Sequence, residues 1–437
     1  MKSESETKVD SNGTQNSCPT QNPGLSNRKD EVQATRIRPG TRRYHRFSGV
    51  LTQISVLLLT LFAITVLPNC SPEEVNLQGS TMGTSYSVKI RNPEQHLDTS
   101  TLKEEIDQLL HETDYRFSSW QKEELHRINN QPVGQSIPIS PDFCVVLYKS
   151  QMVWQASQGA FDPTIGTLIN LWGFGPEKRT GEPSESEVQK ALLQSGFEKL
   201  KLNYPSGPVE SKYNSDLSHI RTLYDEQYTD ESKTGTSTKA NPARTSTCQL
   251  TRTANLNLNL SAIAKGHGVD RLAEFLLKKG IKDFMVEIGG EVKTGPGGSF
   301  RIGIERPNYD GSRSLYTVLE SANNCIATSG NYRNFFEKDG HIYSHLLDPN
   351  TGRPGLSRIQ SATIIGPDCA IADALATAAM IVSPERTQKI IKEVQNRTGQ
   401  NYDYLLLESG KLIQGDTENF KIQEYTSDRL ASIRIDK

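Results

Sequence analysis

At 437 residues, the chain is long enough to form one large domain or two domains of ordinary size. Its formal net charge of −2 gives no indication of a nucleic-acid partner. The six cysteines form no Cys-x-x-Cys pair and show no zinc-ligand spacing, so they indicate no zinc site and leave disulfides as an open alternative.

Residues 1–46 are polar and almost free of apolar clusters, so we predict that this segment is disordered. Several arginines precede Phe47–Leu67, a largely apolar segment that carries no charge and is long enough to span a bilayer. A basic flank before an apolar run is typical of an export signal or a signal anchor. A buried core helix is the alternative, but the segment lacks an amphipathic period.

The apolar segment ends in Leu67-Pro68-Asn69-Cys70, so the export region spans residues 47–70. These four residues resemble a bacterial lipobox, in which the cysteine is lipidated after the leader is cleaved. Pro68 and Asn69 depart from the small residues usual there, so both a lipidated Cys70 and an uncleaved anchor stay open. In either case we expect attachment to the cell membrane, with the folded part on the periplasmic or extracytoplasmic side.

The folded part begins with a predicted strand at Leu77–Arg91, where apolar and polar residues alternate. Helices are predicted at Thr101–Thr113, which carries an apolar stripe, and at Phe143–Gln158. The next segment, Ala160–Gly175, is dense in glycine and aromatic residues. This composition suits a loop that lines a planar ligand, and a packed aromatic turn explains it equally well.

Pro205–Thr253 differs from the rest of the chain, because Ser and Thr are frequent in it and apolar residues are sparse. Such a composition cannot bury a core, so we predict a disordered insertion within a folded domain that covers residues 77–435. The insertion follows Leu200–Asn203, at a place where a hairpin tolerates extra residues.

The stretch Leu256–Gly290 reads as strand, turn, helix and strand. Its leucines alternate at first, Gly266 and Gly268 then break the pattern, and helical spacing starts at Val269. A glycine-rich turn before a helix lets backbone N–H groups approach an anion, and Lys265 lies at that turn. The alternative is an ordinary β-turn-α-β unit with a surface lysine.

Beyond this stretch the sequence predicts short strands joined by turns, among them a tight hairpin at residues 339–340. Asp368 is placed to cap a helix at Cys369–Val382, and another helix follows it. Short strands are predicted around Tyr404–Leu407 and Leu412–Gln414.

Asp373 and Thr377 lie four residues apart on the alanine-rich helix, hence on the same face. A carboxylate and a hydroxyl so placed suit Mg²⁺, which usually takes its remaining ligands from water and substrate phosphates. A solvated helix face is the more frequent explanation of such a pair. His345 and Asp348 form a second polar pair, for which a turn is the more frequent explanation.

Seven motifs follow one another along the chain. They are GSTMGTSYSV (79–88), AFDPTIG…WGFG (160–175), LNLSAIAKGHGVD (258–270), EIGGEV (287–292), ATSGNYR (327–333), SHLLDPNTGRP (344–354) and ADALATA (372–378). Together they resemble the FAD:protein FMN transferase (ApbE-type) family. The resemblance covers Leu77 to Gly415 apart from the insertion, and seven collinear motifs leave little room for a chance match.

The resemblance implies an α+β fold of the T-fold-like kind, with FAD held between two lobes. It places the FAD-contacting residues at Met82, Trp120, Ala160, Phe161, Asp162, Asn259, Lys265 and Thr328. It places the magnesium ligands at Asp373, Thr377 and the backbone carbonyl of Ala262.

Three positions depart from the family pattern. Ala376 stands where the Asp-rich form of the metal motif has a second Asp, and Glu291 stands where an Asp often follows the Gly-Gly pair. Asn259 stands where Asp is common. Asparagine keeps an acceptor oxygen but loses the charge, which puts a polar FAD contact in doubt more than catalysis.

The resemblance also implies Mg²⁺-dependent transfer of the FMN moiety of FAD to a threonine of an exported acceptor protein, such as a subunit of a membrane redox pump, with release of AMP. Phosphoryl transfer needs charge neutralisation and in-line positioning, which Mg²⁺ on Asp373 and Thr377 would supply, with Lys265 as a second cation. His345 is the candidate for deprotonating the threonine or orienting phosphate.

Two other functions stay open at this point. One is a Mg²⁺-dependent FAD pyrophosphatase, in which water replaces threonine; the same metal site serves both reactions. The other is a flavin-binding lipoprotein without catalysis, against which Asp373 and Thr377 argue.

Overall fold

The structure is a computed structural model, and it describes residues 74–93, 97–119, 123–176, 179, 181–204, 248–308, 312–331, 335–338, 341–344, 346–355, 357–409 and 422–435. The predicted disordered leader, the apolar segment 47–67, Cys70, Trp120, His345 and most of the predicted insertion lie outside these residues. Among the helices that the structure describes, none combines the length and the apolar character needed to cross a bilayer.

An eight-stranded antiparallel sheet forms the framework of the described part of the chain. Its strands follow one another in space in the same order as in the sequence. They are β1 (Glu74–Thr81), β2 (Thr84–Arg91), β6 (Phe284–Ile288), β7 (Glu291–Thr294), β10 (Cys325–Gly330), β15 (Ile359–Gly366), β16 (Asp403–Ser409) and β17 (Ile422–Thr426). The segments between these strands leave the sheet and build the layers on its two faces.

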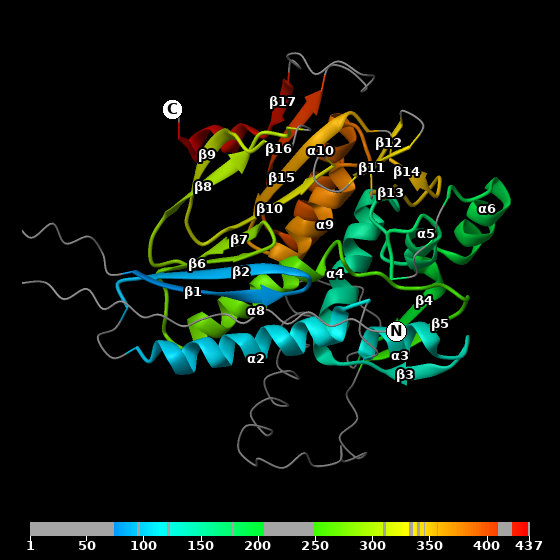
Figure 1. Cartoon of the computed structure of the whole chain (residues 1–437), viewed down its shortest axis with the longest axis horizontal. Helices are drawn as coiled ribbons and strands as arrows, with labels where there is room; N and C mark the ends of the chain where they lie inside the picture. Colours follow the sequence, from blue (N-terminus) through cyan, green and yellow to red (C-terminus); the bar gives the residue numbers. More distant parts are fainter. Residues whose placement is uncertain are drawn as a thin grey trace, which may run out of the picture. The chain divides into compact units, whose positions relative to one another are not determined.

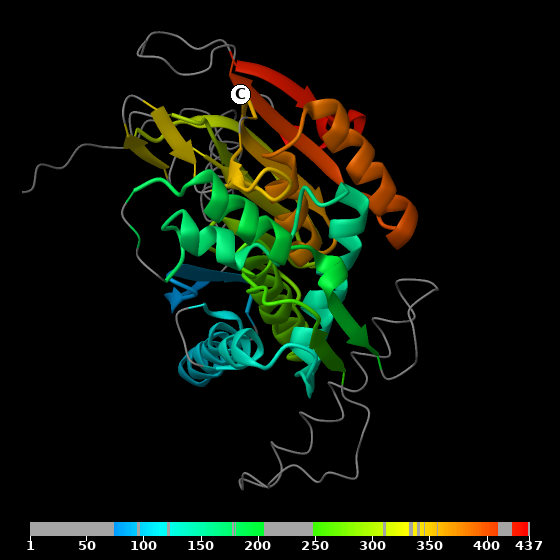
Figure 2. The same ribbon diagram turned by 90° about the vertical axis from the view of Figure 1, so that its right-hand side faces the viewer.

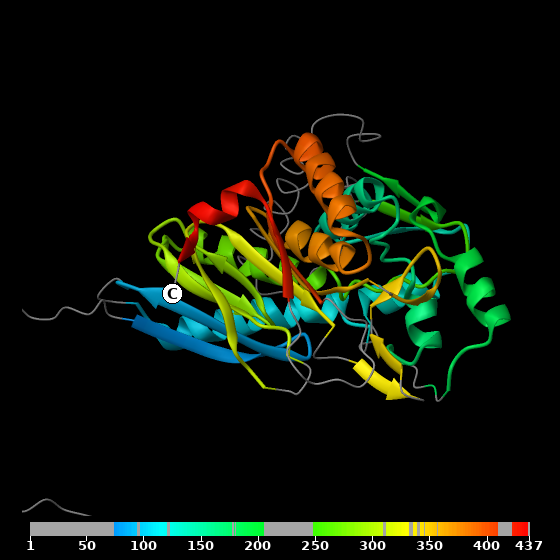
Figure 3. The ribbon, with the colours of Figure 1, turned by 90° about the horizontal axis from the view of Figure 1, so that it is seen from above.

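Helices cover one face of this sheet, and a small sheet covers the other (Figure 1). The helix layer comprises α2 (Thr99–Phe117), α4 (Pro141–Ser157), α8 (Ala264–Lys278), α9 (Cys369–Ala379) and α10 (Pro384–Thr398). The small sheet comprises β8 (Phe300–Glu305), β9 (Leu315–Ser321) and β18 (Arg434–Ile435). Successive side chains of β15 point to opposite faces of the sheet. Ile364 therefore packs into the core on the helix side, and Ile365 packs into the core on the opposite face. Figure 3 shows α9 and α10 (orange) one after the other beside the strands.

A second group of short elements lies at the end of the molecule that faces the viewer in Figure 2. It contains the three-stranded sheet β3 (Ser136–Pro138), β5 (Gln249–Arg252) and β4 (Leu200–Asn203), with α3 (Glu124–Asn130), α5 (Gly166–Leu171), α6 (Glu185–Gln194) and η1 (Phe197–Lys199). The remaining elements are β11 (Phe335–Lys338), β12 (His341–Ser344), β13 (Leu347–Asp348), β14 (Arg353–Pro354) and η2 (Asp428–Ser432). The architecture is a mixed α+β fold, as predicted.

The predicted insertion extends too far at its C-terminal end. β5 lies inside the interval 205–253, where it pairs with β3 on one side and β4 on the other. Leu250 and Arg252 are buried, and Cys248 forms a disulfide with Cys144 of α4. Polar residues alternate with the buried side chains of β5, so the sequence did not indicate this short strand. Residues 204–248 therefore connect two adjacent strands of a hairpin.

The stretch Leu256–Gly290 differs from its prediction at two points. Its first leucines are buried as the alternation indicates, yet they form an extended segment with a single isolated bridge, between Asn257 and Ile165, and no strand. The helix α8 starts at Ala264, so Gly266 and Gly268 lie within it. Tertiary packing requires glycine at both positions, because a Cβ at either one would come too close to atoms of a neighbouring element.

Local signals placed α2, α4, α9 and α10, whereas α3, α5 and α6 were not predicted. The side chain of Asp368 accepts a hydrogen bond from the N–H of Ile371 and so caps α9, as predicted. α10 starts at Pro384 after the N-cap Ser383. The predicted hairpin at residues 339–340 is confirmed, because β11 and β12 pair directly on either side of it. The predicted strand at Leu412–Gln414 lies outside the described residues.

Candidate active site

A cavity of about 880 Å³ is lined by segments that lie far apart in the sequence. The lining comes from the β1–β2 turn, the segment after α4, the start of α8, the β6–β7 turn, the end of β10 and α9. A volume of this size is typical of small-molecule and cofactor sites. The site residues predicted from the sequence that line it are Met82, Ala160, Phe161, Asp162, Asn259, Ala262, Lys265, Thr328, Asp373 and Thr377. The predicted site residues Trp120 and His345 lie outside the part of the chain that the structure describes.

A close approach of α8 and α9 fixes the position of Asp373. Gly266 lies against the start of α9, where a Cβ on this residue would come 2.2 Å from the carbonyl oxygen of Cys369. The backbone N–H of Gly266 donates a hydrogen bond of 3.1 Å to Oδ2 of Asp373. Any residue larger than glycine at position 266 would displace α9 and, with it, the carboxylate.

Lys265 lies between two buried carboxylates. Its Nζ is 2.9 Å from Oε1 of Glu291 and 3.6 Å from Oδ1 of Asp373. Both acidic side chains are 2% exposed, whereas that of Lys265 is 29% exposed. One ammonium group thus faces two acids, and the three groups lack one positive charge when both acids are ionised.

The pKa values of this cluster follow from burial and from the charges within it. Burial raises the pKa of Glu291 and that of Asp373, although Lys265 opposes both shifts. Burial alone would lower the pKa of Lys265, but the two carboxylates outweigh it and raise that pKa. Lys265 therefore stays protonated, and the two acids compete for its charge.

The cavity offers the oxygen ligands that a hard cation requires. Asp373 supplies a carboxylate and Thr377, one helical turn later, a hydroxyl that lies 3.4 Å from Oγ of Ser329. Ala262, whose carbonyl is the third predicted ligand, lines the same cavity. No set of three or more His, Cys, Asp or Glu side chains is placed to hold a metal within the described ranges. The donors fit Mg²⁺, which commonly fills the rest of its shell with water and substrate oxygens.

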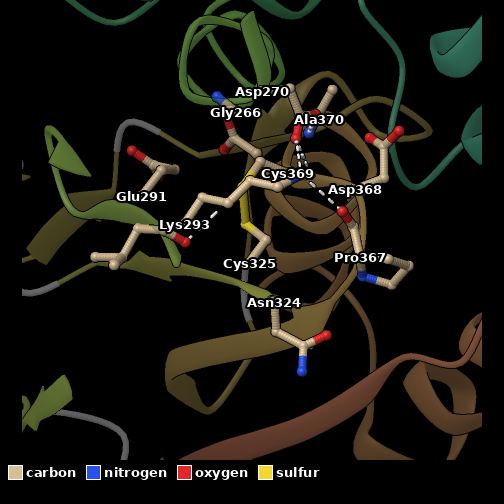
Figure 4. Close-up of a disulfide and its surroundings, with 12 residues drawn as sticks. Gly266, Asp270, Glu291, Lys293, Asn324, Cys325, Pro367, Asp368, Cys369 and Ala370 are labelled. Carbon is tan, nitrogen blue, oxygen red and sulfur yellow. Dashed lines mark hydrogen bonds and ion pairs between the residues drawn. A yellow bond between two sulfur atoms is a disulfide. The ribbon is translucent and has the colours of Figure 1, made fainter. Parts of the chain in front are cut away.

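The first turn of α9 is anchored on its buried side by an ionic network and a disulfide (Figure 4). The carboxylate of Asp270 accepts hydrogen bonds of 3.1 Å from the N–H groups of Cys369 and Ala370. Nζ of Lys293 donates to the same carboxylate at 2.6 Å. The disulfide Cys325–Cys369 joins this turn to the start of β10. The helix that carries Asp373 is thus fixed at its origin.

A second lysine and a second aspartate complete the network. Nζ of Lys149, which is 1% exposed, lies 2.6 Å from Oδ2 of Asp368 and 3.7 Å from Oδ2 of Asp270. Burial would raise the pKa of Asp270, but Lys293 and Lys149 hold it below its ordinary value. Two lysines thus face two aspartates in this network, whereas one lysine faces two acids in the cluster around Lys265.

The β1–β2 turn places Met82 at the cavity. Met82 and Gly83 connect the paired residues Thr81 and Thr84, and both have positive φ angles, of 51° and 71°. Such a two-residue turn joins antiparallel strands tightly. A Cβ on Gly268 would come 2.9 Å from Cε of Met82, so this glycine of α8 makes room for the methionine.

The segment 160–175 combines residues that line the cavity with residues that pack into the fold. Phe161 and Asp162 line the cavity, as a ligand-lining loop requires. Trp172 instead packs with α5 and α6, and its indole N–H donates to the carbonyl of Gly352 at 2.8 Å. The segment therefore lines the cavity with some of its residues and packs into the fold with others.

Asp162, Asn259 and Thr328 show how polar groups at the cavity are oriented. Oδ1 of Asp162 accepts from the N–H and the hydroxyl of Thr164, and burial nevertheless raises the pKa of Asp162 to about 6. Oδ1 of Asn259 accepts from the N–H of Ser261 at 3.0 Å. The hydroxyl of Thr328 lies 2.9 Å from that of Thr363 on β15.

Glu291 is the group that sequence reasoning passed over, since it attracted notice only as a departure from the family pattern. It opens β7 directly after Gly289 and Gly290, whose φ angles of 58° and 104° make the turn sharp. A charged residue that starts a buried strand after such a turn is a signal that could have identified it. Its pairing with Lys265 depends on contacts that the sequence does not reveal.

The fold is similar to that of solved flavin transferases. A structure described as "Flavin Transferase ApbE from Vibrio cholerae" matches with a TM-score of 0.64 and 31% identity, covering 83% of this chain and 99% of that one. The apo form of a flavinyl transferase ApbE from Pseudomonas stutzeri matches with a TM-score of 0.62 and 25% identity, covering 83% and 97%.

The chain belongs to the ApbE family, whose model matches residues 82–400. Two curated relatives described as FAD:protein FMN transferases support this placement. The protein from Vibrio cholerae is 35% identical over 346 residues, which cover 77% of this chain and 91% of the relative. The protein from Haemophilus influenzae is 32% identical over 350 residues, which cover 78% and 90%.

Proposed function

We propose that this chain transfers the FMN part of FAD to a threonine hydroxyl of an acceptor protein, with Mg²⁺ as the required cation and AMP as the second product. It is an FAD:protein FMN transferase, as its curated relatives are. The observation that supports the cation dependence is the charge of the cluster in the cavity, where Asp373 and Glu291 share the single ammonium of Lys265. A divalent cation would supply the positive charge that lets both acids ionise.

The cavity suggests how FAD is held. Its lining joins the main sheet and its helix layer, which contribute Met82, Lys265 and Thr328, to the segment that contains Phe161 and Asp162. We take these as the two lobes of a T-fold-like architecture, with FAD between them. The isoalloxazine ring would lie against the apolar and aromatic part of this lining, and the pyrophosphate near Lys265.

The reaction exchanges one phosphorus–oxygen bond for another. The threonine oxygen forms a bond to the phosphorus of the FMN part, the bond from that phosphorus to the bridging oxygen breaks, and AMP leaves with the electron pair while threonine loses its proton. Bound Mg²⁺ supplies charge neutralisation at the phosphates. Asp373 and Thr377 would hold this cation, Lys265 would neutralise phosphate oxygens, and His345 is the candidate that takes the proton.

We also propose that the reaction takes place outside the cytoplasm, on an exported acceptor. The basic flank and the apolar segment Phe47–Leu67 support export, followed by attachment through a lipidated Cys70 or an uncleaved anchor. The disulfides Cys144–Cys248 and Cys325–Cys369 agree with this location, because disulfides persist in oxidising compartments.

The test is incubation of purified protein with FAD, Mg²⁺ and candidate acceptors, followed by mass analysis. The acceptor should gain one FMN unit while an equal amount of AMP is released. Asp373→Ala should slow transfer by about a hundredfold or more, because it removes an anionic ligand of the cation. Thr377→Ala should do less damage, since water replaces a neutral hydroxyl more easily than a charge.

The control is Asp428→Ala, which alters an exposed aspartate outside the cavity and should leave the rate unchanged. Free FMN and AMP with an unmodified acceptor would instead favour a pyrophosphatase. Full transfer by Asp373→Ala would show that the cation is placed wrongly.

A further inference from the structure

The carboxylate of Glu291 is only half satisfied. Oε1 pairs with Lys265, whereas Oε2 is buried and has no hydrogen-bond partner among the described residues. A buried carboxylate oxygen without a partner is costly, since it has lost its water and gained nothing in return. Asp373 differs, because its two oxygens face the N–H of Gly266 and the ammonium of Lys265. Glu291 therefore keeps a buried acceptor without a partner in the described part of the chain, on a side chain that lines the same cavity as Asp373.

Lys265 has the freedom to leave these acids. Its aliphatic part passes over Gly289, where a Cβ would come 3.3 Å from Cδ of the lysine. Its side chain, which lines the cavity, is 29% exposed, whereas those of the two acids are 2% exposed. A lysine ammonium on a flexible four-carbon stem can change partners without a movement of the backbone.

We propose that Lys265 acts as an internal stand-in for the divalent cation. In the cation-free protein its ammonium holds Asp373 and Glu291 together. The entering cation displaces it, binds the free oxygen of Glu291 directly or through a water, and releases Lys265 toward the phosphates of the ligand. This inference rests on the cation dependence in the proposed function, and it adds Glu291 to the groups that hold the cation.

The charges give this exchange a consequence for the order of binding. With Lys265 alone, the cluster has no surplus positive charge, whether one acid or both are ionised, so it offers no net attraction to an anionic ligand. With a divalent cation added, the same groups sum to +1, which attracts a pyrophosphate. The loaded cavity therefore attracts FAD more strongly than the cation-free cavity does.

Binding of Mn²⁺ to the purified protein without FAD tests the exchange, with free Mn²⁺ followed by electron paramagnetic resonance. Lys265→Met removes the competitor, so this variant should bind Mn²⁺ about tenfold more tightly than the parent. Glu291→Gln keeps the shape but removes a ligand charge, so it should bind about tenfold more weakly. The exposed ion pair of Lys279 and Glu105 offers matched controls. Lys279→Met and Glu105→Gln should leave the affinity unchanged.

Unchanged or weaker Mn²⁺ binding by Lys265→Met would overturn the proposed exchange, as would unchanged Mn²⁺ binding by Glu291→Gln. A parent protein that binds no Mn²⁺ without FAD would overturn the exchange alone, because the cation can still enter with the phosphates of FAD. Only transfer that proceeds without a divalent cation would overturn the cation dependence of the proposed function.

The unaltered protein provides a measurement that does not depend on the folding of variants. Acetic anhydride labels free amines, and peptide mass analysis gives the rate at Lys265. This rate should rise severalfold when Mg²⁺ is added, because the ammonium leaves its carboxylates, while the rate at Lys279 stays constant. An equal rate at Lys265 with and without Mg²⁺ would contradict the exchange.

Discussion

At the scale of single residues, Asp162 shows burial and hydrogen bonding acting in opposite directions. Two donors from Thr164 stabilise the charged carboxylate, yet loss of solvent dominates and raises the pKa from 3.8 to about 6. The folded chain therefore binds a proton at Asp162 more tightly than the unfolded chain does. The stability that this group contributes is full below about pH 4 and is lost as the pH rises through about 6.

We predict that Asp162→Asn removes this dependence on pH. The free energy of unfolding, measured by urea titration, should be compared for parent and variant between pH 4 and 7. The advantage of the parent over the variant should shrink by up to about 3 kcal/mol as the pH rises, which is the value of two pKa units. A difference that stays constant across this range would show that Asp162 titrates normally.

The sequence identified site residues whose role depends on local spacing or on a motif. Asp373 and Thr377 face one cavity because four residues make one helical turn. Glu291 and Gly266 were missed or misread because their roles depend on partners elsewhere in the chain. Gly266 was interpreted as part of a turn, but it is required by the contact with Cys369, which lies more than a hundred residues further on.

At the scale of elements, the same distinction separates confirmed from failed predictions. Helix α9 and the β11–β12 hairpin were predicted closely, because a cap and a tight turn are encoded in neighbouring residues. β5 was lost in a polar segment, since four residues carry too little periodicity to be recognised. The alternation at Leu256–Leu260 marked burial correctly, but a strand also needs a partner along its length.

The hairpin that carries the insertion gives a prediction at this scale. Asn203 of β4 and Gln249 of β5 are directly paired, so the ends of the intervening segment are held together by the fold. Replacing residues 206–246 with a short Gly/Ser linker should leave the melting temperature and FAD binding close to those of the parent.

The matched control deletes the strand itself. Removal of 248–252 takes away the buried side chains of Leu250 and Arg252 and the disulfide to Cys144, so this variant should fail to fold. A large loss of stability from the linker variant, comparable to that of the control, would show that the segment is structural.

At the scale of the whole molecule, two disulfides tie distant elements together. Cys144–Cys248 fastens the helix layer to the sheet of β3, β4 and β5, and Cys325–Cys369 joins the main sheet to α9. They close loops with sequence separations of 104 and 44 residues, so each should stabilise the fold by restricting the unfolded chain.

We predict that replacing either pair by serine lowers the free energy of unfolding by about 4 kcal/mol, as urea titration would measure. Transfer activity should separate the two variants. Cys325→Ser/Cys369→Ser loosens the first turn of α9 and should slow transfer, whereas Cys144→Ser/Cys248→Ser should leave the rate of the folded protein unchanged. Equal stability of parent and variants would mean that the cysteines are reduced in the native protein.

The position of Lys265 between Asp373 and Glu291 also bears on how the protein reaches its working state. Two buried acids without a counter-ion would make the fold dependent on metal from the start. With an ammonium group of its own between them, the chain can fold and stay folded before any metal binds. Under the proposed cation dependence, the supply of magnesium would then control when the protein works and not whether it folds.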